Sequence, residues 1–73
     1  MTKLPVVSGR QLVKALEQCG FVFDRQRGSH MMLFHSDPPT TLSIPDHHEL
    51  DRGTLRAILR QAGISLSRLL ELL

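Results

Sequence analysis

The stretch FVFDRQRGSHMMLFH, residues 21–35, decides the fold because a glycine separates two runs of strand-forming residues. The first run starts at Phe21 and continues towards Arg27, and residues 30–35 form the second. Gly28 is the turn residue, since glycine adopts backbone conformations that are closed to other residues. Residues 31–34 are uniformly apolar, so the sequence does not show which face of the second strand is buried. The stretch predicts two neighbouring strands.

A third strand follows directly. Residues 36–39 contain two prolines and predict a turn. Residues 40–44 then alternate polar and apolar side chains, which is typical of a half-buried strand. Pro45 ends this strand, so three short antiparallel strands are expected.

A helix is predicted before the strands. Ser8 and Gln11 have the spacing of a capping box, in which the serine hydroxyl accepts from the N3 amide and the glutamine reaches back. Apolar residues then recur at helical spacing and form one face: Leu12, Ala15, Leu16 and Cys19. Gly20 ends the helix because it turns left-handed at no steric cost.

Two helices are predicted after the strands. Asp51 caps the first, where its carboxylate also favours the positive helix end, and Gly63 ends it. The apolar face of this helix consists of Leu55, Ile58, Leu59 and Ala62. Ser65 caps a last short helix whose apolar residues are Leu66, Leu69, Leu70 and Leu73. The result is an α+β fold in one domain over residues 1–73, with helices on one sheet face and the other face free for function.

Composition narrows the class of protein. The chain has 73 residues and a single cysteine, which excludes an internal disulfide and fits a reducing compartment. No apolar run approaches the roughly 18 residues of a membrane span, so no membrane association is expected and the cytoplasm is the expected location.

The charges are unevenly distributed along the chain. Residues 1–28 carry five basic and two acidic residues, a net +3, and residues 52–73 carry four basic and one acidic, also +3. Residues 29–51 have four acidic residues, no Lys or Arg, and all four histidines. Basic flanks can meet a polyanion such as RNA, although they are equally typical of solvated helix faces.

His30 is the first candidate for chemistry, because histidine is the residue type that exchanges protons near neutral pH. A metal site is not expected. His30 and His35 are five residues apart, which places them on opposite faces of a strand, and His47-His48 is a poor chelate for the same reason. Cys19 belongs to the apolar face of the first helix, so it is expected in the core rather than as a reactive thiolate.

Several short motifs together resemble the HicA-type toxins of toxin–antitoxin pairs. The motifs in chain order are Ser8-Gly9, Gly20-Phe21, Gly28-Ser29-His30, Ile44-Pro45-x-His47, Gly53-Thr54-Leu55-x-x-Ile58-Leu59 and Gln61-Ala62-Gly63. The resemblance implies a fold like a double-stranded-RNA-binding domain and the activity of an mRNA interferase, an endoribonuclease that blocks translation. It also implies a HicB-type antitoxin as partner, which masks the active site. In such pairs the antitoxin usually supplies the DNA-binding part, so direct DNA binding by this chain alone is not expected.

The resemblance implies that the essential histidine is His30, acting as general acid or base without a metal or cofactor. His47 is a possible second proton carrier. The expected RNA-binding residues are Arg25, Arg27, Gly28, Ser29, Arg52 and Arg56, with Arg60 on the same helix face as the last two. Residues 31–34 depart from the basic or polar strand that the resemblance implies, which predicts weak RNA contacts or an apolar surface that faces a partner.

Two other functions remain open from the sequence. The chain could be a non-catalytic RNA-binding or antitoxin-binding module of the same fold. It could also be a structural domain that assembles through its leucine-rich C-terminal segment, residues 66–73.

Overall fold

The computed structural model describes residues 3–73 and confirms the predicted α+β fold and element order. The elements are α1 (Gly9–Glu17), β1 (Val22–Arg27), β2 (His30–Ser36), β3 (Pro39–Pro45), α2 (Arg52–Ala62) and α3 (Leu66–Leu72). The extent of the domain, residues 1–73, stays a prediction, and its first two residues lie outside the described residues.

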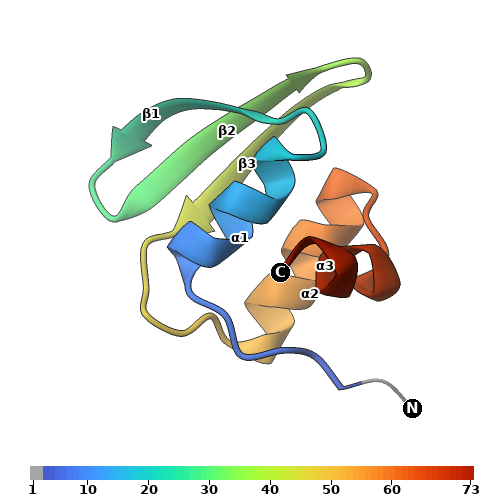
Figure 1. Ribbon diagram of the computed structural model, residues 1–73. Helices are drawn as coiled ribbons and strands as arrows, with labels where there is room; N and C mark the ends of the chain where they lie inside the picture. The colour runs from blue at the N-terminus through green and yellow to red at the C-terminus, as the bar shows by residue number, and fades with distance from the viewer. Residues whose placement is uncertain (1–2) are drawn as a thin grey trace.

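The three strands form one antiparallel sheet in the order β1-β2-β3. Arg27 is the register partner of His30 on β2, and His30 in turn is the partner of Pro45 on β3. The register of β1 shifts between Phe23 and Arg25, which leaves Asp24 as a bulge. Figure 1 shows all three helices on one side of the sheet, so the other side is an open face, which we call the outer face.

The core lies between the sheet and the helices. Successive side chains of β2 and β3 point to opposite faces of the sheet. Met31 and Leu33 on β2 therefore face the helices and are buried. Leu42 and Ile44 on β3 are their register partners and are also buried. The helices contribute Leu12 and Leu16 from α1, and Leu55, Ile58 and Leu59 from α2. The predicted alternation of β3 and the apolar face of α2 are confirmed, and β2 now has an assigned buried face.

The start of α1 is held against the end of β3. The predicted capping box is present: Ser8 Oγ accepts from the Gln11 amide at 3.1 Å, and the Ser8 amide donates to Gln11 Oε1 at 2.8 Å. Gly9 packs so closely that a Cβ atom there would collide with the Pro45 carbonyl oxygen. Gly9 is therefore required by backbone packing, which fixes α1 next to the end of the strand that pairs with His30.

The structure corrects several details of the predicted elements. Strand β3 begins at Pro39 and ends at Pro45. It tolerates these prolines because it is an edge strand and needs no amide donor on its free side. The predicted turn at residues 36–39 shrinks to residues 37 and 38. Helix α1 ends at Glu17, so Cys19 lies beyond it, half-buried against the core.

Two predicted roles of side chains also change. Asp51 occupies the N-cap of α2, but its carboxylate makes no capping hydrogen bond. The Thr54 side chain in the first turn of α2 is the main cause that lowers the pKa of this carboxylate. In α3, Leu69 is buried and Leu66 packs on the core as predicted, whereas Leu70 and Leu73 are exposed and Leu72 packs instead.

Candidate active site

His30 stands on the outer face of the sheet, directly after the β1–β2 turn. Its side chain is exposed, while its neighbour Met31 is buried on the opposite face. Gly28 has φ +59° and Ser29 has no positive φ, a pattern typical of a two-residue hairpin turn of type II′. The turn sequence therefore sets which face of the sheet His30 joins.

Among the described residues, one ring nitrogen of His30 has a hydrogen-bond partner and the other has none. Nδ1 lies 3.1 Å from the Ser43 hydroxyl on β3. When Nδ1 carries the proton and donates to Ser43 Oγ, Nε2 has a free lone pair. This arrangement orients the ring and leaves Nε2 able to accept a proton.

A shallow hollow surrounds His30 on the outer face. It is lined by Arg27, His30, Met32 and Ser43. Arg25 is the register partner of Met32 and so lies on the same face, two register pairs from Arg27 and His30. The structure thus brings together His30 and two of the predicted RNA-binding arginines, Arg25 and Arg27, with positive charge beside a group that can exchange protons.

Asp46 holds the turn in front of His30. Its amide donates to the Ser29 carbonyl at 2.7 Å. Gln26 Nε2 donates both to the Gly28 carbonyl at 3.2 Å and to Asp46 Oδ2 at 3.3 Å. Gly28 and Ser29, predicted as RNA-binding residues, are therefore joined through their backbones to the strand that precedes them and to the loop that follows β3.

An ion pair connects the same carboxylate to α1. Arg10 Nε lies 3.1 Å from Asp46 Oδ1, and this hydrogen bond, with the guanidinium charge, lowers the pKa of Asp46. Sequence reasoning missed Asp46. The available signal was its position between Pro45 and His47, inside a motif whose middle residue was left unassigned.

His47 lies near His30 in the fold but lines a different hollow. That hollow is formed by Ser8, Arg10, Asp46, His47 and His48. The His47 carbonyl accepts from the Gly9 amide at 2.9 Å, which fixes its backbone to the start of α1. The structure does not bring the two predicted proton carriers into one hollow.

Arg52 and Arg56 belong to the helix layer. Both are exposed on α2, as is Arg60, and α2 covers the side of the sheet opposite the outer face (Figure 1). The predicted RNA-binding residues therefore form two groups on opposite sides of the sheet.

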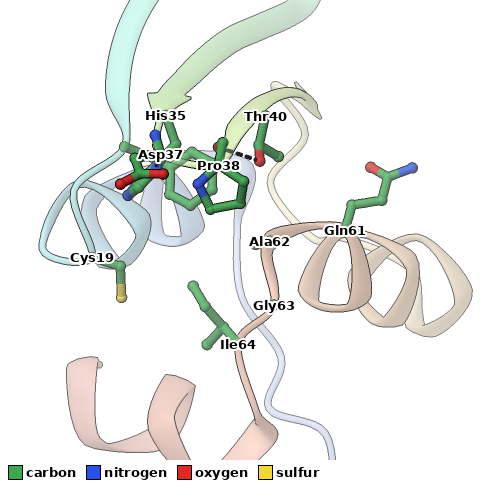
Figure 2. A pocket seen from close by; sticks show the side chains of 10 residues that line it. Cys19, His35, Asp37, Pro38, Thr40, Gln61, Ala62, Gly63 and Ile64 are labelled. Carbon is green, nitrogen blue, oxygen red and sulfur yellow. Dashed lines mark hydrogen bonds between the residues drawn. The ribbon is translucent and has the colours of Figure 1, made fainter.

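His35 lies at the other end of β2 and on the other face from His30, as predicted. It is half-buried and packs against the Phe21 ring at 5.0 Å, and its Nδ1 accepts from the Asp37 amide at 3.1 Å. Figure 2 shows the hollow that it lines between the β2–β3 turn and the end of α2. None of the predicted site residues lines this hollow.

Comparison with known families decides the class of protein. The family model described as "HicA toxin of bacterial toxin-antitoxin" matches residues 9–64. The chain belongs to the HicA toxin family. Its role is that of the toxin in a toxin–antitoxin pair, which implies an antitoxin as partner. No curated protein gives a significant match to the chain.

The range matched to the HicA family contains every predicted site residue and ends just before α3. Within residues 3–73, no three His, Cys, Asp or Glu side chains lie close enough to hold a metal ion together. Over the same residues, no helix is both long and apolar enough to cross a membrane.

Proposed function

We propose that this HicA-family toxin is a metal-independent endoribonuclease that cleaves mRNA and thereby inhibits translation, with His30 as general acid or base. The observation that supports this proposal most is the hollow on the outer face. There an exposed histidine is oriented through Nδ1 by Ser43 and lies next to Arg27. A proton-exchanging group and a cation are the two elements that cleavage of RNA by its own hydroxyl requires.

The reaction uses the 2′-hydroxyl of RNA as nucleophile. Nε2 of His30 takes the proton of this hydroxyl as its oxygen attacks the adjacent phosphorus. The bond from phosphorus to the 5′-oxygen breaks, giving a 2′,3′-cyclic phosphate and a 5′-hydroxyl once the leaving oxygen is protonated. Arg27 stabilises the extra negative charge on the phosphoryl oxygens in the transition state. Such proton transfer is worth about 10²- to 10⁴-fold in rate.

His47 is the proposed second proton carrier, which would protonate the leaving 5′-oxygen. It follows Pro45 by two residues, and Pro45 is the register partner of His30. The His47 side chain would have to reach the scissile phosphate from its own hollow.

The arginines have two proposed roles, according to the side of the sheet on which they lie. Arg25 and Arg27 would contact phosphates next to the scissile bond, whereas Arg52 and Arg56 would hold RNA that continues around the helix layer. Removing Arg25 or Arg27 should therefore reduce cleavage more than removing Arg52 or Arg56.

The proposed partner is a HicB-type antitoxin that covers the outer face and blocks access to His30. The exposed apolar side chains of Val22 and Phe34 on that face suit such a contact. Messenger RNA as substrate places the proposed reaction in the cytoplasm.

The same outer face also favours one second candidate, a non-catalytic RNA-binding or antitoxin-binding module. The supporting observation is that apolar side chains stand beside His30, and β2 and β3 contain no Lys or Arg. Such a module would bind RNA with strong salt dependence and without cleavage, and His30→Ala would leave that binding largely intact.

Induction of the chain without its antitoxin tests the proposed function. Wild type and Glu71→Ala, an exposed residue of α3 that lines neither the His30 hollow nor the His47 hollow, should arrest growth and degrade mRNA. His30→Ala should do neither, at equal protein level and with the same thermal midpoint. Full toxicity of a folded His30→Ala variant would contradict the assignment, and loss of purified activity on adding EDTA would contradict metal independence.

A further inference from the structure

We propose that Phe34 is a substrate-positioning residue on which an RNA base stacks, so that the outer face takes RNA as a single strand. This inference rests on the proposed function, since it assigns the form of RNA that reaches His30. It gives a role to an aromatic side chain that neither the catalytic step nor the core uses.

Phe34 is exposed and lies in line with His30. Its side chain is 44% exposed although it sits in the central strand of the sheet. Because side chains alternate along a strand, Phe34 shares the outer face with Met32 and His30 and lies about 13 Å from His30 along β2. Its register partners are Val22 on β1 and Thr41 on β3, and neither carries a ring that could cover it.

The residues between Phe34 and His30 form a continuous surface that suits the bases and phosphates of RNA. Met32 stands midway, with Arg25 and Ser43 as its register partners, and Arg27 is the partner of His30. The two arginines on β1 thus lie along one side of a row of apolar and aromatic side chains on β2. Single-stranded RNA is bound in this way, with bases on aromatic faces and phosphates on cations.

The charge of the outer face favours a polyanion as its occupant. Within the described strands, the residues whose register places them on this face include Arg25 and Arg27 and no carboxylate. Asp24 stands at the bulge of β1 without a register partner, and Asp37 lies in the turn beyond β2. An apolar protein contact alone would not require the two arginines.

The chemistry also favours a single strand over a duplex. Attack requires the 2′-oxygen, the phosphorus and the leaving 5′-oxygen to approach a line. A duplex holds its backbone in regular A-form geometry, whereas an unpaired nucleotide is free to rotate. Its unstacked base is then available to a protein ring. A base held on Phe34 would fix the strand while the nucleotide at His30 rotates.

The test compares Phe34→Leu and Phe34→Trp with a matched control, Phe23→Ala. Leucine keeps an apolar side chain but removes the ring, and tryptophan restores a stacking surface. Phe23 is a second exposed phenylalanine, at 42%, but its register partner Leu33 is buried, so it belongs to the helix-facing side. Thermal unfolding of each variant checks that the fold is retained.

Three readouts are measured on oligoribonucleotides that are single-stranded or fully paired. The first is kcat/KM for cleavage. The other two are the affinity for a strand that contains fluorescent 2-aminopurine and the quenching of that fluorescence, measured on His30→Ala proteins that carry no further change, Phe34→Leu, Phe34→Trp or Phe23→Ala. We expect cleavage of the single strand only. Phe34→Leu should lower kcat/KM and affinity about ten-fold or more and remove the quenching of 2-aminopurine. Phe34→Trp should restore all three, and Phe23→Ala should behave as wild type.

The outcomes separate this inference from the proposed function. If wild type cleaves RNA and Phe34→Leu has the same kcat/KM, affinity and quenching, the stacking role is overturned and the nuclease proposal stands. Equal cleavage of paired and unpaired RNA would also overturn the stacking role. If nothing cleaves but Phe34→Leu loses affinity and quenching, the nuclease proposal fails and the stacking role stands.

Discussion

The His30 ring has one nitrogen near a hydroxyl and one without a described partner. Because Ser43 is on β3 and His30 on β2, the hydrogen bond at Nδ1 ties the ring to the neighbouring strand. Ser43 is thus a positioning residue, whose effect passes through the imidazole. A net hydrogen bond of this kind is worth about 1 kcal/mol.

Ser43→Ala should therefore lower kcat by about five- to ten-fold, the equivalent of one such bond. Ser43→Thr should preserve the rate, since it keeps a hydroxyl and suits a strand. The measurement is single-turnover cleavage of RNA, with the thermal midpoint of each variant as control. A rate for Ser43→Ala equal to wild type would show that Ser43 does not orient the ring.

The ion pair between Asp46 and Arg10 makes the stability of the fold depend on pH. Arg10 lowers the pKa of Asp46 below its ordinary value of 3.8 in the folded chain, so the carboxylate favours folding when it is ionised. That contribution to stability is present in full when the pH is above the ordinary pKa of Asp46. It is lost as the pH falls through the lowered pKa of the folded chain. It is small, because the Arg10 side chain is 75% exposed.

Asp46→Asn should accordingly lower the thermal midpoint slightly at pH 6 and by progressively less as the pH falls below about 4. Thermal unfolding of both proteins between pH 6 and 2.5 measures this difference. A difference that widened towards low pH would show that the ionised carboxylate does not stabilise the fold.

At the scale of elements, α1 approaches β3 closely enough to exclude any side chain at Gly9. The sequence showed Ser8-Gly9 only as a cap and a family motif, because the contact depends on how two distant segments pack. Gly53 is different, since a Cβ atom there would make only ordinary contact with Asp51 at 3.5 Å. The two glycines sit in the first turns of α1 and α2 and make a matched pair.

Gly9→Ala should destabilise the fold by about 1–3 kcal/mol through overpacking against the Pro45 carbonyl. Gly53→Ala should be neutral or stabilise by up to about 1 kcal/mol, as alanine favours a helix. Urea unfolding gives both free energies. Equal stability of Gly9→Ala and wild type would show that α1 packs less closely on β3.

Local sequence patterns predicted the elements with clear periodicity. The capping box at Ser8, the alternation of β3 and the apolar face of α2 are each decided by neighbours in the chain, and the structure confirms them. The buried face of β2 was not predictable, because Met31, Met32 and their neighbours have no alternation. Pairing with β3 decides it, since Leu42 and Ile44 face the helices.

At the scale of the whole molecule, the fold separates residues that the RNA-binding prediction grouped together. The predicted RNA-binding arginines lie partly on the outer face and partly on α2, because the helices cover one side of the sheet only. His30 and Arg27 come together through strand register, which the two-residue turn determines. Asp46 joins this site through contacts with distant segments, at Arg10 and Ser29, and its position between Pro45 and His47 gave no indication of those contacts.

The decisive measurement for the proposed activity is the cleavage rate of a single-stranded RNA by purified wild type and His30→Ala in the presence of EDTA. We predict that wild type cleaves at an undiminished rate with the chelator and that folded His30→Ala is slower by about 10²- to 10⁴-fold. Cleavage by His30→Ala at the wild-type rate would contradict the proposal that His30 transfers the proton.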